Sequence, residues 1–70
     1  MQSENPVRLL RIDEVQRRVG LRRTAIYQRI KDGAFPRAVP LTATARAWRE
    51  DEVSAWIAAR IALRDAGRAA

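Results

Sequence analysis

The sequence predicts a mainly α-helical fold with a small β-hairpin wing, which is the winged helix-turn-helix class. Three features of its 70 residues support this prediction. Two short amphipathic segments are joined by about three residues that include a glycine, a proline-containing segment follows, and a longer amphipathic segment comes last. Because 70 residues suffice for one minimal domain, we expect no separate ligand-sensing or catalytic module.

The first two helices are predicted from the spacing of apolar residues. Ile12, Val15 and Val19 share one helical face, and Gly20 follows them as a typical helix end. Residues 21–22 form a short joint between the two helices. The second helix and its glycine end are indicated by Ala25, Ile26, Ile30, Asp32 and Gly33.

A short hairpin is predicted after the second helix. Pro36 and Pro40 exclude a helix here, whereas 38–41 and 46–48 can pair as two strands with a tip at 42–45. Since a proline cannot donate a hydrogen bond to a neighbouring strand, the strand that contains Pro40 should lie at a sheet edge.

A third helix is predicted from Glu50 to about Asp65. Its first turn is acidic and complements the positive helix end, and consecutive carboxylates there cannot converge on one metal ion. The face that we expect to be buried carries Val53, Trp56, Ile57 and Ile61.

We assign Trp48 and Trp56 to the core in preference to a role as stacking platforms for single-stranded nucleic acid. The cations of the last turns are Arg60, Arg64 and Arg68. We expect them to complement the negative helix end rather than to contact a phosphate strand.

These elements divide the chain into three parts: a flexible arm at 1–7, a folded domain at 8–65 and a frayed tail at 66–70. No apolar run approaches the roughly 18 residues of a membrane span, and the polar start of the chain has no signal-peptide pattern. We therefore expect a cytoplasmic, nucleoid-associated protein that does not contact a membrane.

Composition favours a polyanionic partner and argues against an enzyme. The 14 lysine and arginine residues against 8 acidic ones give a net charge of +6. The sequence has no cysteine and no histidine, so we expect neither a structural zinc nor thiolate or imidazole chemistry. Ser3 and Ser54 have no histidine partner, and no glycine-rich phosphate loop is present. We predict no enzymatic activity and no cofactor.

The second helix carries a donor-rich face that suits double-stranded DNA. Its members fall within roughly 140° of one another, away from the apolar residues: Arg23, Thr24, Tyr27, Gln28 and Lys31. Arginine pairs with guanine, glutamine with adenine, and threonine and tyrosine reach thymine methyl groups or phosphates. Any surface helix displays such residues, but Arg22 and Arg23 also occupy the helix start, where a neutral or acidic cap is usual. Cations at the start of a helix favour the binding of a phosphate there.

The predicted hairpin tip is a candidate wing. Thr42, Thr44 and Arg46 are placed to follow a DNA backbone or to enter a minor groove. The alternatives are a solvated turn and, for Arg46, a residue that simply flanks Trp48 in its strand.

Three motifs carry a resemblance to a known family. Thr24-Ala25-Ile26-Tyr27, Gly33-Ala34-Phe35-Pro36 and Glu52-Val53-Ser54-Ala55-Trp56-Ile57, within residues 8–61, resemble the AlpA family of phage and prophage regulators. The resemblance implies a winged helix-turn-helix related to MerR-type DNA-binding domains and to small excisionases. It places the second helix on the family's recognition surface and 42–46 on its wing. The sequence departs from the family in having Arg22 where serine is common and in lacking the usual wing glycine.

The leading hypothesis is a sequence-specific double-stranded DNA-binding protein that regulates transcription of phage or mobile-element genes. An alternative within the family is an excisionase, a recombination directionality factor that bends attachment-site DNA for an integrase. A third hypothesis is a protein-interaction adaptor that uses the second helix on an acidic partner. These hypotheses include an integrase or RNA polymerase as a further partner, and they include dimeric or cooperative assembly on DNA because one short helix covers few base pairs.

Overall fold

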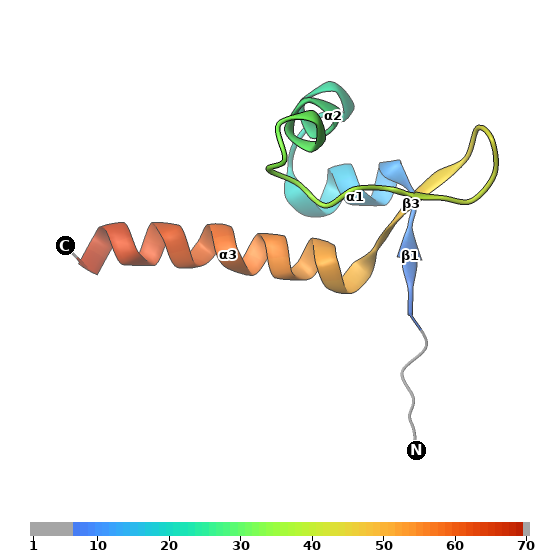
Figure 1. Ribbon diagram of the computed structural model, residues 1–70. Coiled ribbons are helices and arrows are strands. Elements are labelled where there is room, and N and C mark those ends of the chain that lie inside the picture. The colour runs from blue at the N-terminus through green and yellow to red at the C-terminus, as the bar shows by residue number, and fades with distance from the viewer. Residues whose placement is uncertain (1–6, 70) are drawn as a thin grey trace, which may run out of the picture.

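The computed structural model describes residues 7–69 and contains three helices and a three-stranded antiparallel sheet in that range (Figure 1). The arrangement is the predicted mainly helical fold with a hairpin wing. Residues 1–6 of the predicted arm and Ala70 of the predicted tail lie outside the described residues. In chain order the elements are β1 (Leu9–Leu10), α1 (Ile12–Val19), α2 (Arg23–Lys31), β2 (Val39–Pro40), β3 (Arg46–Arg49) and α3 (Glu50–Ala69).

The sheet has the order β1-β3-β2, with β3 antiparallel to both neighbours. Leu10 pairs with Trp48 on one side of β3, and Pro40 pairs with Arg46 on the other. Pro40 therefore lies on an edge strand, as predicted. The sequence did not predict β1, because two residues are too few to show the alternation of a strand.

Glycines end both short helices as predicted. Gly20 has a φ of 74°, in the left-handed region, and its N–H donates to the Gln16 carbonyl at 2.9 Å. Gly33 has a φ of 75°, and the N–H of the following Ala34 donates a hydrogen bond to the Arg29 carbonyl at 2.7 Å. Residues with a Cβ rarely adopt this conformation, so the two glycines fix where α1 and α2 stop. The short joint at 20–22 makes α1 and α2 a helix-turn-helix.

The core lies where α1, α2, the sheet and the first turns of α3 meet. Its largest member is Trp48, whose side chain is completely buried. The residues that form this cluster come from almost every element: Leu10, Val15, Ile26, Phe35, Trp48 and Val53. Trp56 and Ile57 pack against the cluster but are only partly buried. The assignment of Trp48 to the core is confirmed.

Helix α3 is longer than predicted and much of it stands clear of the core. It continues past the predicted end near Asp65 to Ala69. Figure 1 shows that it extends away from the rest of the molecule. Ile61, predicted to be buried, is 46% exposed, and Leu63 is 61% exposed. The prediction for Ile61 was wrong because a 20-residue helix is about 30 Å long and outreaches the small core beneath it.

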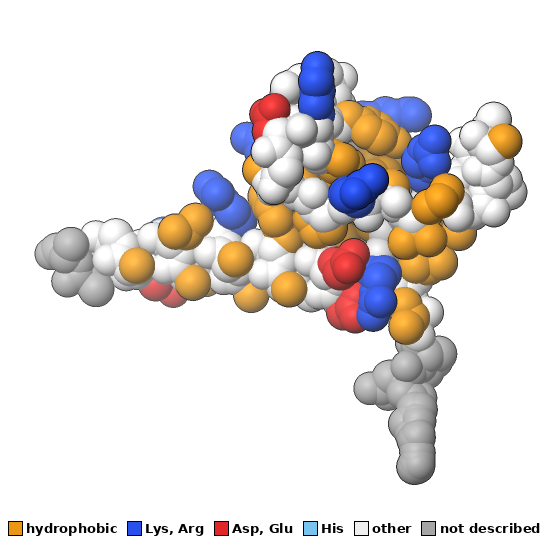
Figure 2. Space-filling view, viewed as in Figure 1, with side chains coloured by type: hydrophobic (Ala, Val, Ile, Leu, Met, Phe, Trp, Pro, Cys, Tyr) orange, Lys and Arg blue, Asp and Glu red, His pale blue; other side chains and the backbone are white. Residues whose placement is uncertain are grey.

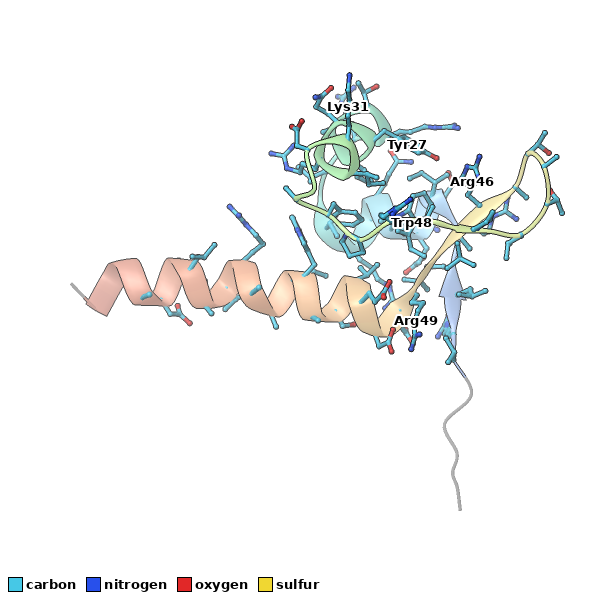
Figure 3. The ribbon with its side chains drawn as sticks, in the orientation of Figure 1. Tyr27, Lys31, Arg46, Trp48 and Arg49 are labelled. Carbon is cyan, nitrogen blue, oxygen red and sulfur yellow. The ribbon has the colours of Figure 1, made fainter. Side chains whose placement is uncertain are left out.

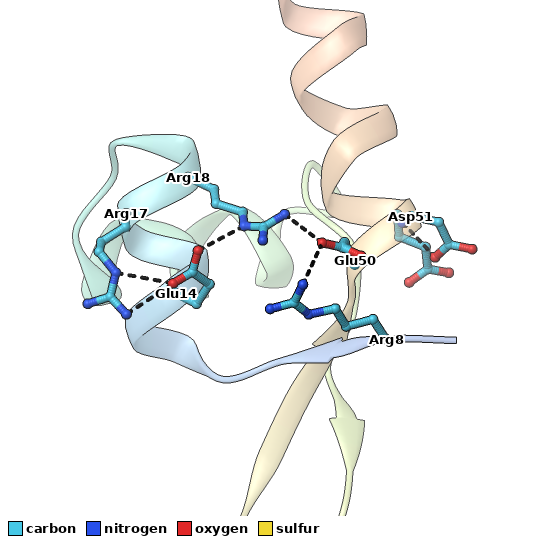
Figure 4. Close-up of polar contacts among 7 residues, drawn as sticks. Arg8, Glu14, Arg17, Arg18, Glu50 and Asp51 are labelled. Atoms are coloured by element: carbon cyan, nitrogen blue, oxygen red, sulfur yellow. Dashed lines mark hydrogen bonds and ion pairs between the residues drawn. The ribbon is translucent and has the colours of Figure 1, made fainter. Parts of the chain in front are cut away.

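A chain of ion pairs connects β1, α1 and α3 (Figure 4). Glu14 accepts hydrogen bonds from Arg17 at 3.1 Å and from Arg18 at 3.0 Å. Arg18 continues to Glu50 at 2.9 Å, and Arg8 lies 3.8 Å from the same carboxylate. Because these groups remain partly exposed to solvent, each pair adds little to stability, but together they connect the start of α3 to α1.

Acidification is expected to weaken this chain of ion pairs. Hydrogen bonds from Arg18 and then Arg17 lower the pKa of Glu14 below its ordinary value of 4.5. Arg49 lowers the pKa of Asp51 below 3.8 in the same way. A depressed folded-state pKa contributes stability above the unfolded-state pKa, and this contribution is lost as the pH falls through the folded-state value. We expect the melting temperature, followed by circular dichroism, to fall on acidification from pH 6 through 4.5 and below.

The matched variants are Glu14→Gln and Glu52→Gln. The first removes a carboxylate that is paired with two arginines, and the second removes one that lies in no ion pair among residues 7–69. On acidification, the melting temperature of the Glu14→Gln protein should decrease by less than that of the Glu52→Gln protein. Equal losses would show that the contacts of Glu14 do not contribute to the pH dependence.

Candidate nucleic-acid interface

Helix α2 presents its predicted polar face to solvent. The side chains of Arg23, Thr24, Tyr27, Gln28 and Lys31 are all exposed. Ile26, on the other side of the helix, is completely buried and holds α2 against the core. Helix periodicity thus separates the two sets of residues as expected, which leaves one face of α2 available to a partner.

Two residues of this face are held in place by aromatic contacts. The Tyr27 ring packs edge-on against Trp48, with 6.0 Å between ring centroids and 66° between ring planes. The Arg23 guanidinium lies 5.8 Å from the centroid of the Tyr27 ring, within cation–π range. Contact with a core tryptophan therefore restricts the Tyr27 ring before any partner binds, which reduces the entropy cost of binding through this side chain.

The start of α2 differs in one respect from the sequence-based interpretation. Arg22 is the N-cap residue and its side chain makes no capping hydrogen bond. However, the Arg23 N–H donates to Oε1 of Gln16 on α1, at 3.1 Å, so one terminal amide is already satisfied within the protein. Sequence reasoning missed Gln16 because it lies on another helix. No acidic residue occupies the first turn of α2, so the positive helix end and both arginines remain uncompensated there.

The tip between β2 and β3 is shaped by its own hydrogen bonds. Leu41 N–H donates to the Ala45 carbonyl at 2.8 Å. The Thr42 hydroxyl oxygen accepts the N–H groups of Thr44 at 3.3 Å and Ala45 at 3.0 Å. Its oxygen therefore helps to form the turn, while its proton can still be donated to an acceptor. Figure 2 shows this tip as a separate projection from the body.

The base of the hairpin is fixed by a residue that sequence reasoning did not single out. Arg11, which precedes α1, donates from Nε to the Arg46 carbonyl at 3.1 Å. The Arg46 side chain is exposed, and residues 7–69 provide no ion-pair partner for it. Thirty-five positions separate Arg11 from Arg46, so no local pattern could have indicated the contact.

Both tryptophans fix the segment between α2 and the hairpin. The Trp56 indole N–H donates to the Ala34 carbonyl at 2.8 Å, and the Trp48 indole N–H donates to the Pro36 carbonyl at 3.1 Å. Phe35 packs edge-on against Trp56, with 5.0 Å between ring centroids. These contacts set the separation between α2 and the hairpin, and they leave neither indole free as a stacking platform.

Acidic partners are unevenly distributed over the molecule. The ion pairs of residues 7–69 use carboxylates on α1 and α3 only: Glu14, Glu50, Asp51 and Asp65. Six cations at the start of α2, along α2 and around the hairpin lie in none of these pairs, and we call them the cationic surface: Arg22, Arg23, Arg29, Lys31, Arg37 and Arg46. Figure 3 shows Tyr27, Lys31 and Arg46 on one side of the molecule, with Arg49 at the opposite edge.

This surface has the chemistry to bind a polyanion. Unpaired arginines are well suited to phosphate and to guanine edges, because the guanidinium forks onto two acceptors. Within the described part of the chain, no group of three or more metal-ligating side chains comes together. No helix there is long and apolar enough to cross a membrane.

Comparison with known proteins assigns the chain to a family. The family described as "Prophage CP4-57 regulatory protein (AlpA)" matches residues 8–61. A similar protein from Enterobacteria phage P4, described as uncharacterized protein ORF88, is 47% identical over 60 residues, which cover 86% of this chain and 68% of the phage protein. The matched range includes both helices of the helix-turn-helix, the hairpin and the packed part of α3. The chain therefore belongs to the AlpA family of prophage regulatory proteins.

Proposed function

We propose that the protein is a sequence-specific double-stranded DNA-binding protein that regulates transcription of phage or mobile-element genes. The cationic surface carries this proposal, because its six cations lie on α2 and around the hairpin without an acidic partner among the described residues. Family membership supports the regulatory role. The expected DNA contacts are those of the sequence-based prediction: Arg22, Arg23, Thr24, Tyr27, Gln28, Lys31, Thr42, Thr44 and Arg46.

The dimensions of α2 support a place in the major groove. An α-helix with its side chains is about 10 to 12 Å across, and the major groove of B-DNA is about 12 Å wide. With 9 residues, α2 is about 14 Å long, which corresponds to roughly four base pairs at 3.4 Å each. Four base pairs give little sequence specificity. Binding of two or more copies at adjacent sites is therefore part of the proposal.

A DNA titration across a salt series tests this function. The probes are labelled fragments from around the protein's own gene, including any nearby integrase attachment site, with scrambled duplexes as controls. Specific binding should be at least about a thousandfold tighter than binding to scrambled DNA. Equal affinities with a steep salt slope would instead indicate purely electrostatic binding and favour an adaptor role.

The same fragments separate a regulator from an excisionase. A single operator that overlaps a promoter supports regulation of transcription. Cooperative filling of several adjacent sites within an attachment site, together with DNA bending in a circular-permutation gel assay, would instead assign the chain to excision.

A further inference from the structure

A hollow of about 320 Å³ lies between α2 and the hairpin. Its polar and charged lining residues are Tyr27, Arg37 and Arg46. Its apolar lining consists of Ile30, Ala38 and Pro40. Figure 3 shows Tyr27 on α2 and Arg46 on β3 on the same side of the molecule. Arg37 is a member of this hollow that sequence analysis did not single out.

The core fixes the backbone beneath both arginines. Arg37 directly follows Pro36, whose carbonyl accepts the indole N–H of the buried Trp48 at 3.1 Å. The carbonyl of Arg46 accepts the Nε–H of Arg11 at 3.1 Å. Tyr27 packs on the same Trp48 ring. Trp48 thus positions Tyr27 directly and Arg37 through its neighbour Pro36, whereas Arg11 holds the backbone of Arg46.

The positive charge of the hollow favours the binding of an anion. Arg37 and Arg46 both line it, and neither lies within 4.0 Å of a carboxylate among the described residues. Two guanidinium groups that share one hollow repel each other unless a negative charge lies between them. The apolar lining residues suit the carbon face of a sugar. A phosphate flanked by deoxyribose combines both chemistries.

We propose that this hollow holds the one phosphodiester strand that separates the major groove occupied by α2 from the minor groove beside the wing. Arg37 and Arg46 hold a phosphate of this strand, Tyr27 donates its hydroxyl, and the adjoining deoxyribose packs on Ile30 and Pro40. The inference rests on the proposed DNA binding and adds Arg37 as a positioning contact that carries no base information.

The salt dependence of binding by Arg37→Ala and Arg49→Ala tests the proposal. Both variants lose one guanidinium, but Arg49 pairs with Asp51 at 2.7 Å on the edge of the molecule away from α2 (Figure 3). The slope of log K against log salt should fall by about 0.9 in Arg37→Ala, since one phosphate contact is lost. In Arg49→Ala the salt slope should stay close to the wild-type value. In Arg37→Lys it should also be close to the wild-type value, because lysine keeps the positive charge. The ratio of specific to scrambled affinity should not change in Arg37→Ala.

Duplexes with a single neutral methylphosphonate locate the contact. Wild-type protein should lose affinity when one particular linkage is neutralised, and Arg37→Ala should be indifferent to that linkage. Equal salt slopes for Arg37→Ala and Arg49→Ala, with folding of both verified by circular dichroism, would overturn the proposal. So would a changed base preference in Arg37→Ala, which would indicate a base contact.

The outcomes distinguish this inference from the proposed function. Phosphate contacts form on any duplex, so the slope change is also measured on scrambled DNA. If wild-type protein shows no sequence preference but the salt slope is still lower in Arg37→Ala than in wild type, the proposed regulatory function is wrong and the phosphate contact stands. If wild-type protein binds a specific fragment and the slope is unchanged in Arg37→Ala, only the phosphate contact fails. Absence of any DNA binding by wild-type protein overturns both.

Discussion

Trp48→Ala is expected to lower the free energy of unfolding by about 3 to 5 kcal/mol. The side chain is completely buried, donates its indole N–H to the Pro36 carbonyl and supports the Tyr27 ring. Removal leaves a cavity and an unsatisfied carbonyl, and neighbouring side chains cannot fill the space. A domain of this size has only a few kcal/mol of net stability, so most of the protein should be unfolded at 25 °C. Urea denaturation followed by circular dichroism measures the loss.

Trp48→Phe is the control for this substitution. Phenylalanine retains most of the buried ring but cannot donate to the Pro36 carbonyl, so the loss should be smaller and should include about 1 kcal/mol from the missing hydrogen bond. A Trp48→Ala protein with an unchanged denaturation midpoint would contradict the assignment of this residue as the centre of the core.

Arg23→Ala is expected to weaken binding to the specific DNA fragment by about 1 to 3 kcal/mol, roughly fivefold to 150-fold, if the side chain contacts a base. Arg23 is exposed at the start of α2, and its guanidinium lies 5.8 Å from the centroid of the Tyr27 ring, so it is accessible to a partner on this face. The fold should survive, because Arg23 contributes nothing to the buried core. Fluorescence anisotropy at fixed salt, on specific and scrambled duplexes, measures the change.

The control for Arg23→Ala is again Arg49→Ala, which loses the same charge from the opposite edge of the molecule. A larger loss on the specific duplex than on the scrambled one indicates a base contact by Arg23. An equal loss on both indicates a phosphate contact. Affinity equal to that of Arg49→Ala would contradict the assignment of α2 as the recognition helix.

Local patterns were sufficient to predict most of the secondary structure. The apolar spacing of α1 and α2 and the glycines that follow them depend on neighbours within a few residues. The hairpin followed from Pro36 and Pro40, because proline constrains its own backbone whatever packs around it. The exposed face of α2 could also be predicted, since a buried Ile26 fixes which residues face outward. DNA contact by those residues stays a prediction.

Contacts between distant segments could not be predicted in this way. Strand β1 exists because β3 offers a free edge to Leu9 and Leu10. Gln16 satisfies the start of α2 only because α1 packs beside it. Ile61 continues the apolar spacing of α3 but is exposed, because the core ends before the helix does.

The order of residues alone was enough to place the helices and the hairpin, to show which face of α2 is polar, and to show that the chain as a whole is cationic. These properties depend on periodicity, on backbone restriction by glycine and proline, and on composition. Which cations lack acidic partners, and which of them share a hollow, became clear only from the packing of the folded chain. Arg37 and Arg46 are brought together because two tryptophan indoles fix the segment between α2 and the hairpin. Such proximity depends on packing between distant residues, which no local pattern records.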